Sequence, residues 1–168
     1  ISSTIDWRKN GSLSKVGNSC AEVQWNQTCQ QFVEISNNGN FFQNYLLELR
    51  NSNGMNFAVT QKEIGLEKGQ TSMEIPVNIT PLENAEAFSI GSTELVLTLS
   101  DGQIIDTIDI SSKTAARVFW VWEESATSVN NGRLEIAITM RNDGNTPDGL
   151  VVRMTSSYFT EMSFIPPN

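Results

Sequence analysis

Residues that could perform chemistry are few in this 168-residue chain, and histidine is not among them. Without an imidazole, a Ser-His-Asp triad, a Cys-His pair and nearly all catalytic zinc or iron sites are excluded. No G-x-G-x-x-G or G-x4-G-K-[ST] run occurs, so nucleotide binding lacks support. Acidic residues could supply the paired carboxylates of a glycosidase, but they fall at predicted turns and outer strand positions. We therefore expect a protein that is not an enzyme.

The two cysteines, Cys20 and Cys29, have eight residues between them. Such a pair is a poor zinc site, because no histidine supplies the remaining ligands. A disulfide that closes this short loop fits better and would stabilise the fold by about 2–3 kcal/mol. Three N-x-[ST] sequons are candidate glycosylation sites, at Asn10, Asn26 and Asn78. Together these features favour an oxidising compartment, so we expect an extracellular or cell-surface protein.

Four oxygen-bearing side chains fall within seven residues near the C-terminal end: Asn142, Asp143, Asn145 and Asp148. Oxygen ligands from one loop suit Ca²⁺. Their spacing departs from the D-x-[DN]-x-[DN]-G pattern of calcium loops, however, and an earlier copy of the segment carries Asn38 and Gln43 at two of the acidic positions. Turn formation is the favoured interpretation, with calcium as the alternative; no other cofactor is expected.

Tryptophans raise the question of carbohydrate binding. Trp120 and Trp122 are two residues apart, so they project from the same face of one predicted strand. Exposed, the pair would form a platform for a sugar ring; buried, it would belong to the core or to a junction between modules. Trp7 is interpreted as the residue of the equivalent strand in the first module, which favours the core or junction. Trp25 is the better candidate for an exposed contact.

Composition narrows the class of protein further. Net charge is −8, with 18% charged and 39% hydrophobic residues, which fits neither a disordered polymer nor a membrane protein. The longest apolar run, 118–122, is too short to span a bilayer, and no basic cluster exists that could bind nucleic acid. The chain opens at Ile1 without a signal-like segment, so we expect that any export signal has been removed.

The strongest signal is a self-match at an offset of 105 residues, between VEISNNGNFFQNYLLEL at 33–49 and ITMRNDGNTPDGLVVRM at 138–154. The aligned turn residues are Asn37 with Asn142, Gly39 with Gly144, and Asn40 with Asn145. Asn, Asp and Gly tolerate positive φ, as a tight connection between strands requires. Apolar residues alternate in register on both sides of the turn. Each copy is therefore predicted to be a strand, a turn and a strand.

Period-two alternation predicts antiparallel strands with one wet face almost throughout. In the first part we expect strands near 4–7, 30–36, 44–50, 56–61, 72–80, 93–100 and 103–111, with a long excursion carrying both cysteines after the first. Seven short strands in about 112 residues are typical of an immunoglobulin-like sandwich. Further strands are expected near 117–123, 133–141 and 148–155, with another beginning at 163–165.

The predicted fold class is therefore all-β: an antiparallel immunoglobulin-like β-sandwich at 1–114, with a disulfide-bearing excursion, and an incomplete second module at 115–168. On one face of its second strand, Leu134, Ile136, Ile138 and Met140 form an apolar stripe. Three strands leave an open edge and a half-covered apolar face. We expect either a fragment of a longer protein, which is favoured, or completion of the sandwich by another chain.

Residues 32–112 resemble the extracellular immunoglobulin-like modules of the NEW3 and CARDB types. The resemblance rests on the N-x-G-N turn after a strand, the Gly turn in IGLEKGQ at 64–70, the strand MEIPVNI at 73–79 and the final hairpin with Asp101-Gly102. It implies tandem β-sandwiches of prokaryotic and archaeal surface proteins, which act as spacers, adhesion units or appendages to enzymes and carry no catalytic residues. The cysteine-bearing excursion at 8–29 departs from the family pattern.

Two functions of different classes follow as expectations. The first is a non-catalytic structural or adhesive module of a surface protein, acting as a spacer or interaction unit. The alternative is a self-assembling subunit of an extracellular filament or surface layer, in which a neighbouring chain completes the second sandwich by strand addition. A carbohydrate-binding module comes third. The expected partners are neighbouring modules or copies of the chain, with glycans as a further option, and neither nucleic acid nor an inserted membrane.

Overall fold

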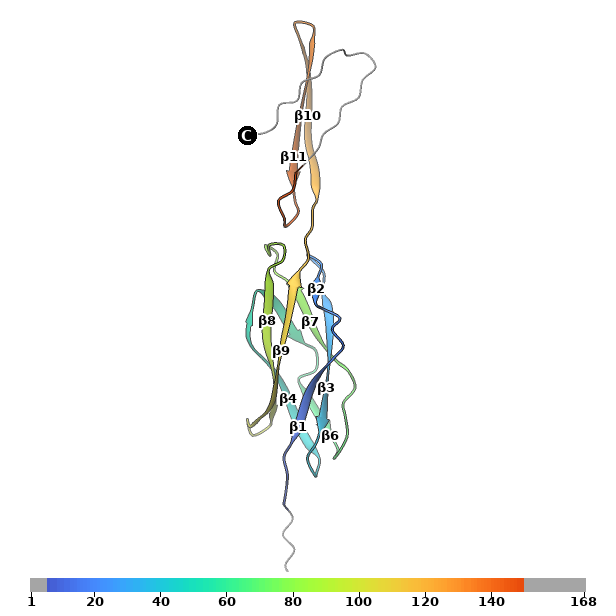
Figure 1. Cartoon of the computed structure of the whole chain (residues 1–168), viewed down its shortest axis with the longest axis vertical. Helices are drawn as coiled ribbons and strands as arrows, with labels where there is room; N and C mark the ends of the chain where they lie inside the picture. Colours follow the sequence, from blue (N-terminus) through green and yellow to red (C-terminus); the bar gives the residue numbers. More distant parts are fainter. Residues whose placement is uncertain (1–5, 150–168) are drawn as a thin grey trace, which may run out of the picture.

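A computed structural model describes residues 6–149, in which eleven strands and no helix occur. Nine strands form two sheets that pack face to face, and the last two form a separate hairpin (Figure 1). The four-stranded sheet has the order β1 (Gly11–Val16), β3 (Cys29–Asn37), β7 (Ile75–Pro81) and β5 (Met55–Val59). The five-stranded sheet has the order β2 (Glu22–Val23), β9 (Ile104–Thr114), β8 (Ile90–Leu99), β4 (Gln43–Asn53) and β6 (Glu63–Leu66).

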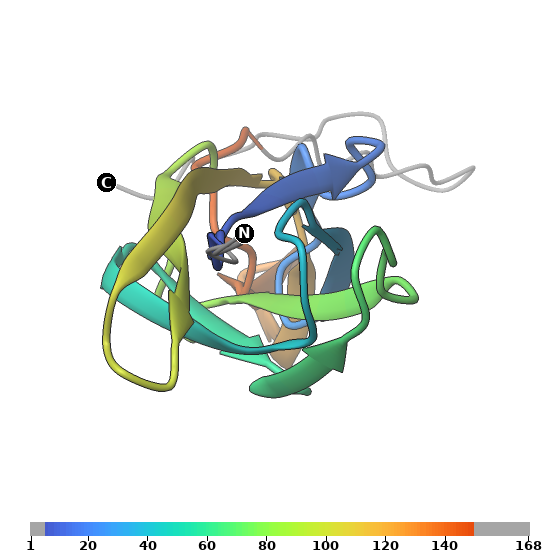
Figure 2. The ribbon, with the colours of Figure 1, turned by 90° about the horizontal axis from the view of Figure 1, so that it is seen from below.

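All strand pairs are antiparallel except β2 with β9, which is parallel. The chain thus enters through β1 in one sheet and crosses to β2 in the other before returning to β3. In the view along the long axis, the strands of the two layers face each other (Figure 2), and the hydrophobic core cluster lies between them. The predicted immunoglobulin-like β-sandwich is confirmed.

The core forms because alternate residues of facing strands point inward. Val33 and Ile35 of β3 are fully buried, as are Tyr45 of β4 and Leu95 and Leu97 of β8. Each such side chain contributes about 1.5–3 kcal/mol by leaving water. Every residue of the hydrophobic core cluster lies between Leu13 and Ile110. Residues 11–114 therefore have a complete core without the hairpin.

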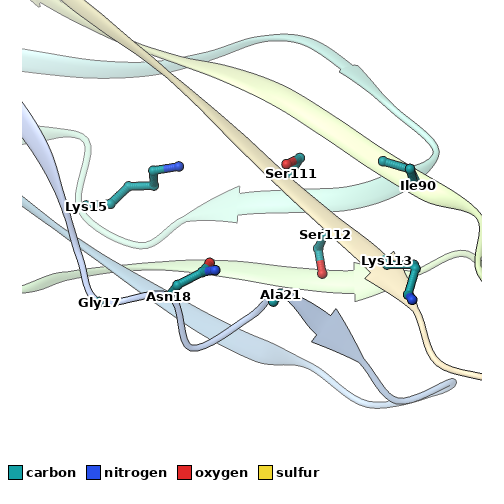
Figure 3. Close-up of a pocket in the computed structure, with 8 residues that line it drawn as sticks. All are labelled: Lys15, Gly17, Asn18, Ala21, Ile90, Ser111, Ser112 and Lys113. Carbon is teal, nitrogen blue, oxygen red and sulfur yellow. The ribbon is translucent and has the colours of Figure 1, made fainter.

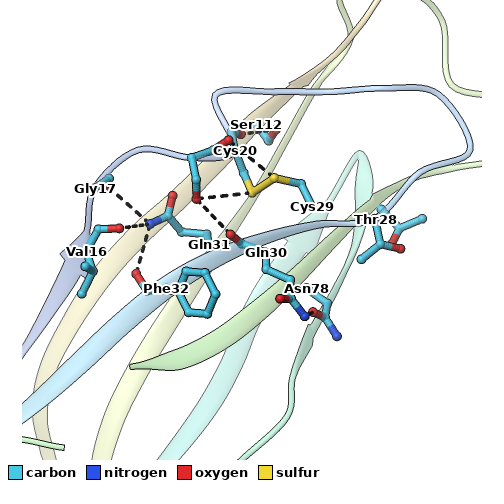
Figure 4. The surroundings of a disulfide bond; sticks show 12 residues. Val16, Gly17, Cys20, Thr28, Cys29, Gln30, Gln31, Phe32, Asn78 and Ser112 are labelled. Atoms are coloured by element: carbon cyan, nitrogen blue, oxygen red, sulfur yellow. Dashed lines mark hydrogen bonds between the residues drawn. A yellow bond between two sulfur atoms is a disulfide. The ribbon is translucent and has the colours of Figure 1, made fainter. Parts of the chain in front are cut away.

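The disulfide predicted between Cys20 and Cys29 is present, with the two Cα atoms 5.8 Å apart (Figure 4). Cys20 is 1% exposed and its carbonyl accepts a hydrogen bond from Ser112 Oγ at 2.6 Å. The segment that follows pairs with the end of β9, where Ala115 N donates to Val23 O at 2.8 Å. The bridge therefore joins both sheets through β2, besides closing the loop that leads into β3.

Two predictions about the first strand were wrong. The expected strand near 4–7 lies instead at β1, and residues 6–10 belong to no strand. Trp7 is 63% exposed and packs edge-to-face on Phe41, with ring centroids 4.8 Å apart. Gly11 pairs with Asn37 as Trp120 pairs with Asn142, so Gly11, and not Trp7, is the equivalent of Trp120.

Two short strands, β2 and β6, had not been predicted, because two and four residues are too few for an alternation signal. The expected strand near 148–155 lies almost entirely outside the described residues, and the one at 163–165 wholly so.

The hairpin consists of β10 (Trp120–Asn130) and β11 (Arg133–Asn142), joined at Asn131-Gly132 with φ of 50° and 77°. Positive φ at both turn residues is typical of a type I′ connection. The first strand of the pair begins three residues later than expected near 117 and runs further, to Asn130. A bulge interrupts β10 between Trp122 and Glu124.

Directly opposed residues share a face, so the expected apolar stripe of β11 lies beside apolar residues of β10. The face comprises the apolar residues Trp120, Trp122, Val129, Leu134, Ile136, Ile138 and Met140, together with Ser125 and Thr127, which lie opposite Ile138 and Ile136. Trp122 is 55% exposed, Val129 76%, and Leu134 and Ile136 each 40%. Within residues 6–149 no second sheet covers this face.

Candidate functional site: the junction between sandwich and hairpin

The repeated turn has the same hydrogen bonds in both copies. Asn37 accepts the N–H of the residue two positions on at 2.9 Å and donates to the carbonyl four positions on at 2.9 Å. Asn142 makes the same two bonds, at 2.8 and 2.9 Å. Gly39 and Gly144 are required here, because a Cβ would collide with a backbone carbonyl of the preceding segment in each copy.

The last asparagine of the turn fixes that preceding segment, again identically. Asn40 Oδ1 accepts from Arg8 N at 2.8 Å, and its Nδ2 donates to the carbonyl two residues before Arg8 at 2.6 Å. Asn145 Oδ1 accepts from Arg117 N at 2.7 Å, and its Nδ2 donates to the carbonyl two residues before Arg117 at 2.9 Å. Arg8 and Arg117 therefore occupy equivalent positions.

The four residues predicted as a calcium alternative do not converge on one point. Asn142 Oδ1 accepts a backbone N–H within the turn, and Asn145 Oδ1 accepts the backbone N–H of Arg117 in the preceding segment. Asp143 Oδ1 pairs with Arg141 Nε at 2.5 Å, and Asp148 Oδ1 accepts from the next backbone N–H at 2.8 Å. Within residues 6–149, no group of three or more His, Cys, Asp or Glu side chains could hold a metal ion. These hydrogen bonds are those of turn formation.

The base of the hairpin contacts the end of the sandwich through Arg117. Its guanidinium contacts two aromatic rings, with the Trp25 and Phe119 centroids each 4.8 Å from Cζ. Trp25 is itself held by a hydrogen bond from Nε1 to the carbonyl of Glu83 at 3.1 Å. A backbone bond from Ala87 N to Asn145 O, at 2.9 Å, joins the β7–β8 connection to the repeated turn. The junction thus combines cation–π contact with backbone pairing.

Trp25, predicted as the better candidate for an exposed contact, makes its contact at the junction. It is half-buried, because the loop closed by Cys20–Cys29 carries it to the end of the sandwich where Arg117 covers its ring. Trp120 is half-buried and Trp122 exposed on the apolar face of the hairpin. Neither belongs to the core of the sandwich.

The sequons lie on the surface of the sandwich. Asn10 and Asn26 are exposed, whereas Asn78 is half-buried and its Oδ1 accepts from Gln30 Nε2 at 3.1 Å. Asn78 alternates with buried residues of β7, so its predicted place on the outer face is correct. The hydroxyls of Thr28 and Thr80, which complete two of the sequons, lie 2.8 Å apart. The sequon in the loop before β3 therefore meets the sequon of β7 through these hydroxyls.

A groove of about 550 Å³ lies between the end of β1 and strand β9 (Figure 3). Its two lysines are already engaged: Lys15 Nζ donates to the carbonyl of Asp109 at 3.2 Å, and Lys113 Nζ lies 3.7 Å from a Glu22 carboxylate oxygen. The remaining lining consists of Gly17, Asn18, Ala21, Ile90, Ser111 and Ser112. The groove presents no nucleophile paired with a base.

No protein-family model matches the chain, and no curated protein does. Among solved structures it is similar to a FixG-related protein from Vibrio parahaemolyticus, with 18% identity, TM-score 0.41 and coverage of 63% of this chain and 94% of that one. It is also similar to a PapD-like domain of human CEP192 (8%, 0.40, 64% and 84%) and to the Escherichia coli chaperone DraB (12%, 0.37, 84% and 88%). At these values the likeness is one of β-sandwich fold alone.

Proposed function

We propose that this chain is a non-catalytic structural module of a secreted or cell-surface protein, in which one β-sandwich holds the next unit end to end. The junction between Trp25 and Arg117 carries the proposal. An interaction or spacer unit of this kind needs a defined end, and here an extra loop and a disulfide are used to build one.

Physical considerations support a junction that resists bending. Cation–π contacts contribute about 0.5–2 kcal/mol, depending on desolvation, and the Ala87–Asn145 hydrogen bond adds about 1 kcal/mol. The contacts come from two different loops of the sandwich, so they oppose bending in more than one direction. The disulfide limits the conformations of the loop that presents Trp25.

The proposal is tested by replacing Arg117 with alanine in the full chain and measuring ¹⁵N relaxation. In the unmodified chain we expect residues 11–114 and the hairpin to tumble with one correlation time. In Arg117→Ala the hairpin should acquire a shorter, separate one. Arg50→Ala is the matched control, because Arg50 is an exposed arginine whose ion pair with Glu48 lies on β4. Independent tumbling of the hairpin in the unmodified chain would contradict the proposal.

A location outside the cytoplasm is part of the same proposal. The Cys20–Cys29 disulfide supports it, because such bonds persist mainly in oxidising compartments. No helix within residues 6–149 could span a membrane.

The resemblance to NEW3 and CARDB modules remains a prediction. Intact mass of the native protein would test glycosylation at Asn10, Asn26 and Asn78.

The open apolar face of the hairpin favours a second candidate, a self-assembling subunit whose neighbour covers that face. Exposed apolar faces of this kind mark protein contacts. Light scattering across a range of concentrations separates the two candidates: a constant monomer mass supports the spacer, and growing polymers support the assembly. Ile136→Lys should abolish polymers that use this face, whereas Thr139→Lys, on the opposite face of β11, should not.

A further inference from the structure

We propose that the opposite end of the sandwich, the end that carries Arg8, is a docking surface for the Trp25 end of another sandwich of this kind, joined upstream in the same polypeptide. The inference rests on the proposed function and names the partner of the free end. The hairpin already docks on a Trp25 end through the second copy of the repeated turn. The first copy of that turn lies at the far end of the long axis (Figure 1).

Equivalence of the two turns is the first step. Six hydrogen bonds recur: four from the paired asparagines and two from backbone N–H groups. One recurring backbone bond runs from Asn40 N to Arg8 O at 3.3 Å and from Asn145 N to Arg117 O at 3.0 Å. The other runs from Asn38 N to Asn10 O at 3.2 Å and from Asp143 N to Phe119 O at 2.7 Å. A surface that is built twice in the same way, each time with an arginine at the same place, can make the same contact twice.

The groups that contact the Trp25 end in the second copy make no such contact in the first. The Arg8 side chain is 76% exposed, and within residues 6–149 its guanidinium pairs with Asp6 but has no aromatic ring over it. The carbonyl of Asn145 accepts the Ala87 N–H, whereas in the same described part of the chain no donor outside the sheets reaches the carbonyl of Asn40. The Arg8 end therefore offers an exposed arginine and a backbone carbonyl, the two groups that bind the Trp25 end in the second copy.

Apolar surface favours the same partner. Trp7 and Phe42 are 63% and 46% exposed at the Arg8 end, so docking there would remove apolar surface from water. Charge does not select the partner, because Arg8 pairs with Asp6 and Lys9 with Asp101 within the Arg8 end.

The connection length is fixed by the chain itself. Asn40 bonds the carbonyl of Asp6, and Asn145 bonds the carbonyl of Ala115, which directly follows Thr114 at the end of β9. Joining Thr114 of one sandwich to Asp6 of the next therefore reproduces the junction without an inserted linker. Viewed along the axis, the start of the described chain lies near the middle of this end of the sandwich (Figure 2), so successive units would stack along the axis.

The test uses a fused chain in which residues 6–114 precede residues 6–168, with the upstream copy labelled with ¹⁵N by segmental ligation. The measured quantity is the amide exchange rate of Ala87 in the upstream copy, compared with that in residues 6–114 alone. Those residues contain the whole core, and protection of Val77 in the central strand β7 checks that they fold. We expect the Ala87 amide to exchange about tenfold more slowly in the fusion.

Arg8→Ala in the downstream copy should restore faster exchange by about threefold or more, and Arg50→Ala should leave it unchanged. Equal exchange in the fusion and in residues 6–114 alone, or no effect of Arg8→Ala, would overturn the inference. The proposed function is judged separately, from the Ala87 amide of the unmodified chain, which Asn145 should protect and Arg117→Ala should expose. A protected native junction with an unprotected fused one would reject the Arg8 end and retain the module.

Discussion

Strand β3 in the sandwich and strand β11 in the hairpin are built from the same pattern but have different surroundings. In β3 the inward residues Val33 and Ile35 are fully buried beneath the second sheet. Their equivalents, Ile138 and Met140, are only half-buried, and Ile136 is 40% exposed. The same turn closes both strands with the same hydrogen bonds. The repeated sequence thus specifies the local structure of both strands. Burial of their apolar residues depends on a facing sheet, which within residues 6–149 covers β3 but not β11.

Removal of buried side chains should show the largest difference between the two strands. Ile35→Ala is expected to lower the free energy of unfolding of the sandwich by about 2–5 kcal/mol, because it leaves a cavity in the core. Met140→Ala, at the equivalent position, should change it by less than about 0.5 kcal/mol, because β11 lies outside that core. Urea unfolding, followed through the amide signals of β8, measures both. Comparable losses would mean that the hairpin face contributes to the sandwich.

The disulfide should give the second-largest difference between the two copies, because the hairpin contains no cysteine. Replacing Cys20 and Cys29 together by serine should lower the free energy of unfolding by about 2–3 kcal/mol, since a nine-residue separation is released. The same variant should loosen Trp25 and raise the amide exchange of Ala87, because the loop no longer presents the indole to Arg117. If stability falls while Ala87 stays protected, the loop does not depend on the bridge for its position.

The sequence predicted those features of the fold that depend on residues close together along the chain. Alternation predicted β3, β4, β7, β8 and β9, because half-buried strands repeat every two residues. The disulfide followed from two cysteines without histidine. The match between the repeats reached only the strands beside the turn, because the segment between the arginine and the turn is four residues longer in the first copy. Arg8 precedes Asn37 by 29 residues, and Arg117 precedes Asn142 by 25.

The contact of Trp25 with Arg117 could not be predicted in the same way. It joins a loop to a linker 92 residues away, and neither segment has a period that indicates its partner. A self-match that allowed this gap would have aligned Arg8 with Arg117 and identified the two arginines as candidates. Trp7 was misassigned because a tryptophan was matched to a tryptophan, whereas the strand pairing matches Gly11 to Trp120.

Replacing the first asparagine of the turn should give a smaller difference in the free energy of unfolding between the two copies. Asn37 is fully buried and also donates to Leu66 O at 2.9 Å and accepts from Tyr45 Oη at 3.1 Å, so it links the turn to both sheets. Asn37→Ala should therefore lower the free energy of unfolding by about 2–3 kcal/mol. Asn142→Ala loses only the bonds within its turn and should leave unfolding of the sandwich unchanged. Equal effects would indicate that the hairpin turn supports the sandwich.

The smallest expected effects on stability come from two surface ion pairs, one in the sandwich and one in the hairpin. Hydrogen bonding from Lys9 and from a backbone N–H lowers the pKa of Asp101 in the sandwich, and hydrogen bonding from Arg141 lowers the pKa of Asp143 in the hairpin. A carboxyl group whose folded-state pKa is lowered stabilises the fold above its unfolded pKa, near 4, and loses that contribution as pH falls through the folded value. Both carboxylates are solvated and screened, so the gain in stability should be small and should shrink with salt. NMR titration should find both pKa values below the ordinary range, and Lys9→Ala should raise that of Asp101 alone. A rise at Asp143 in the same variant would mean that the two regions are electrostatically coupled, which the separate ion pairs argue against.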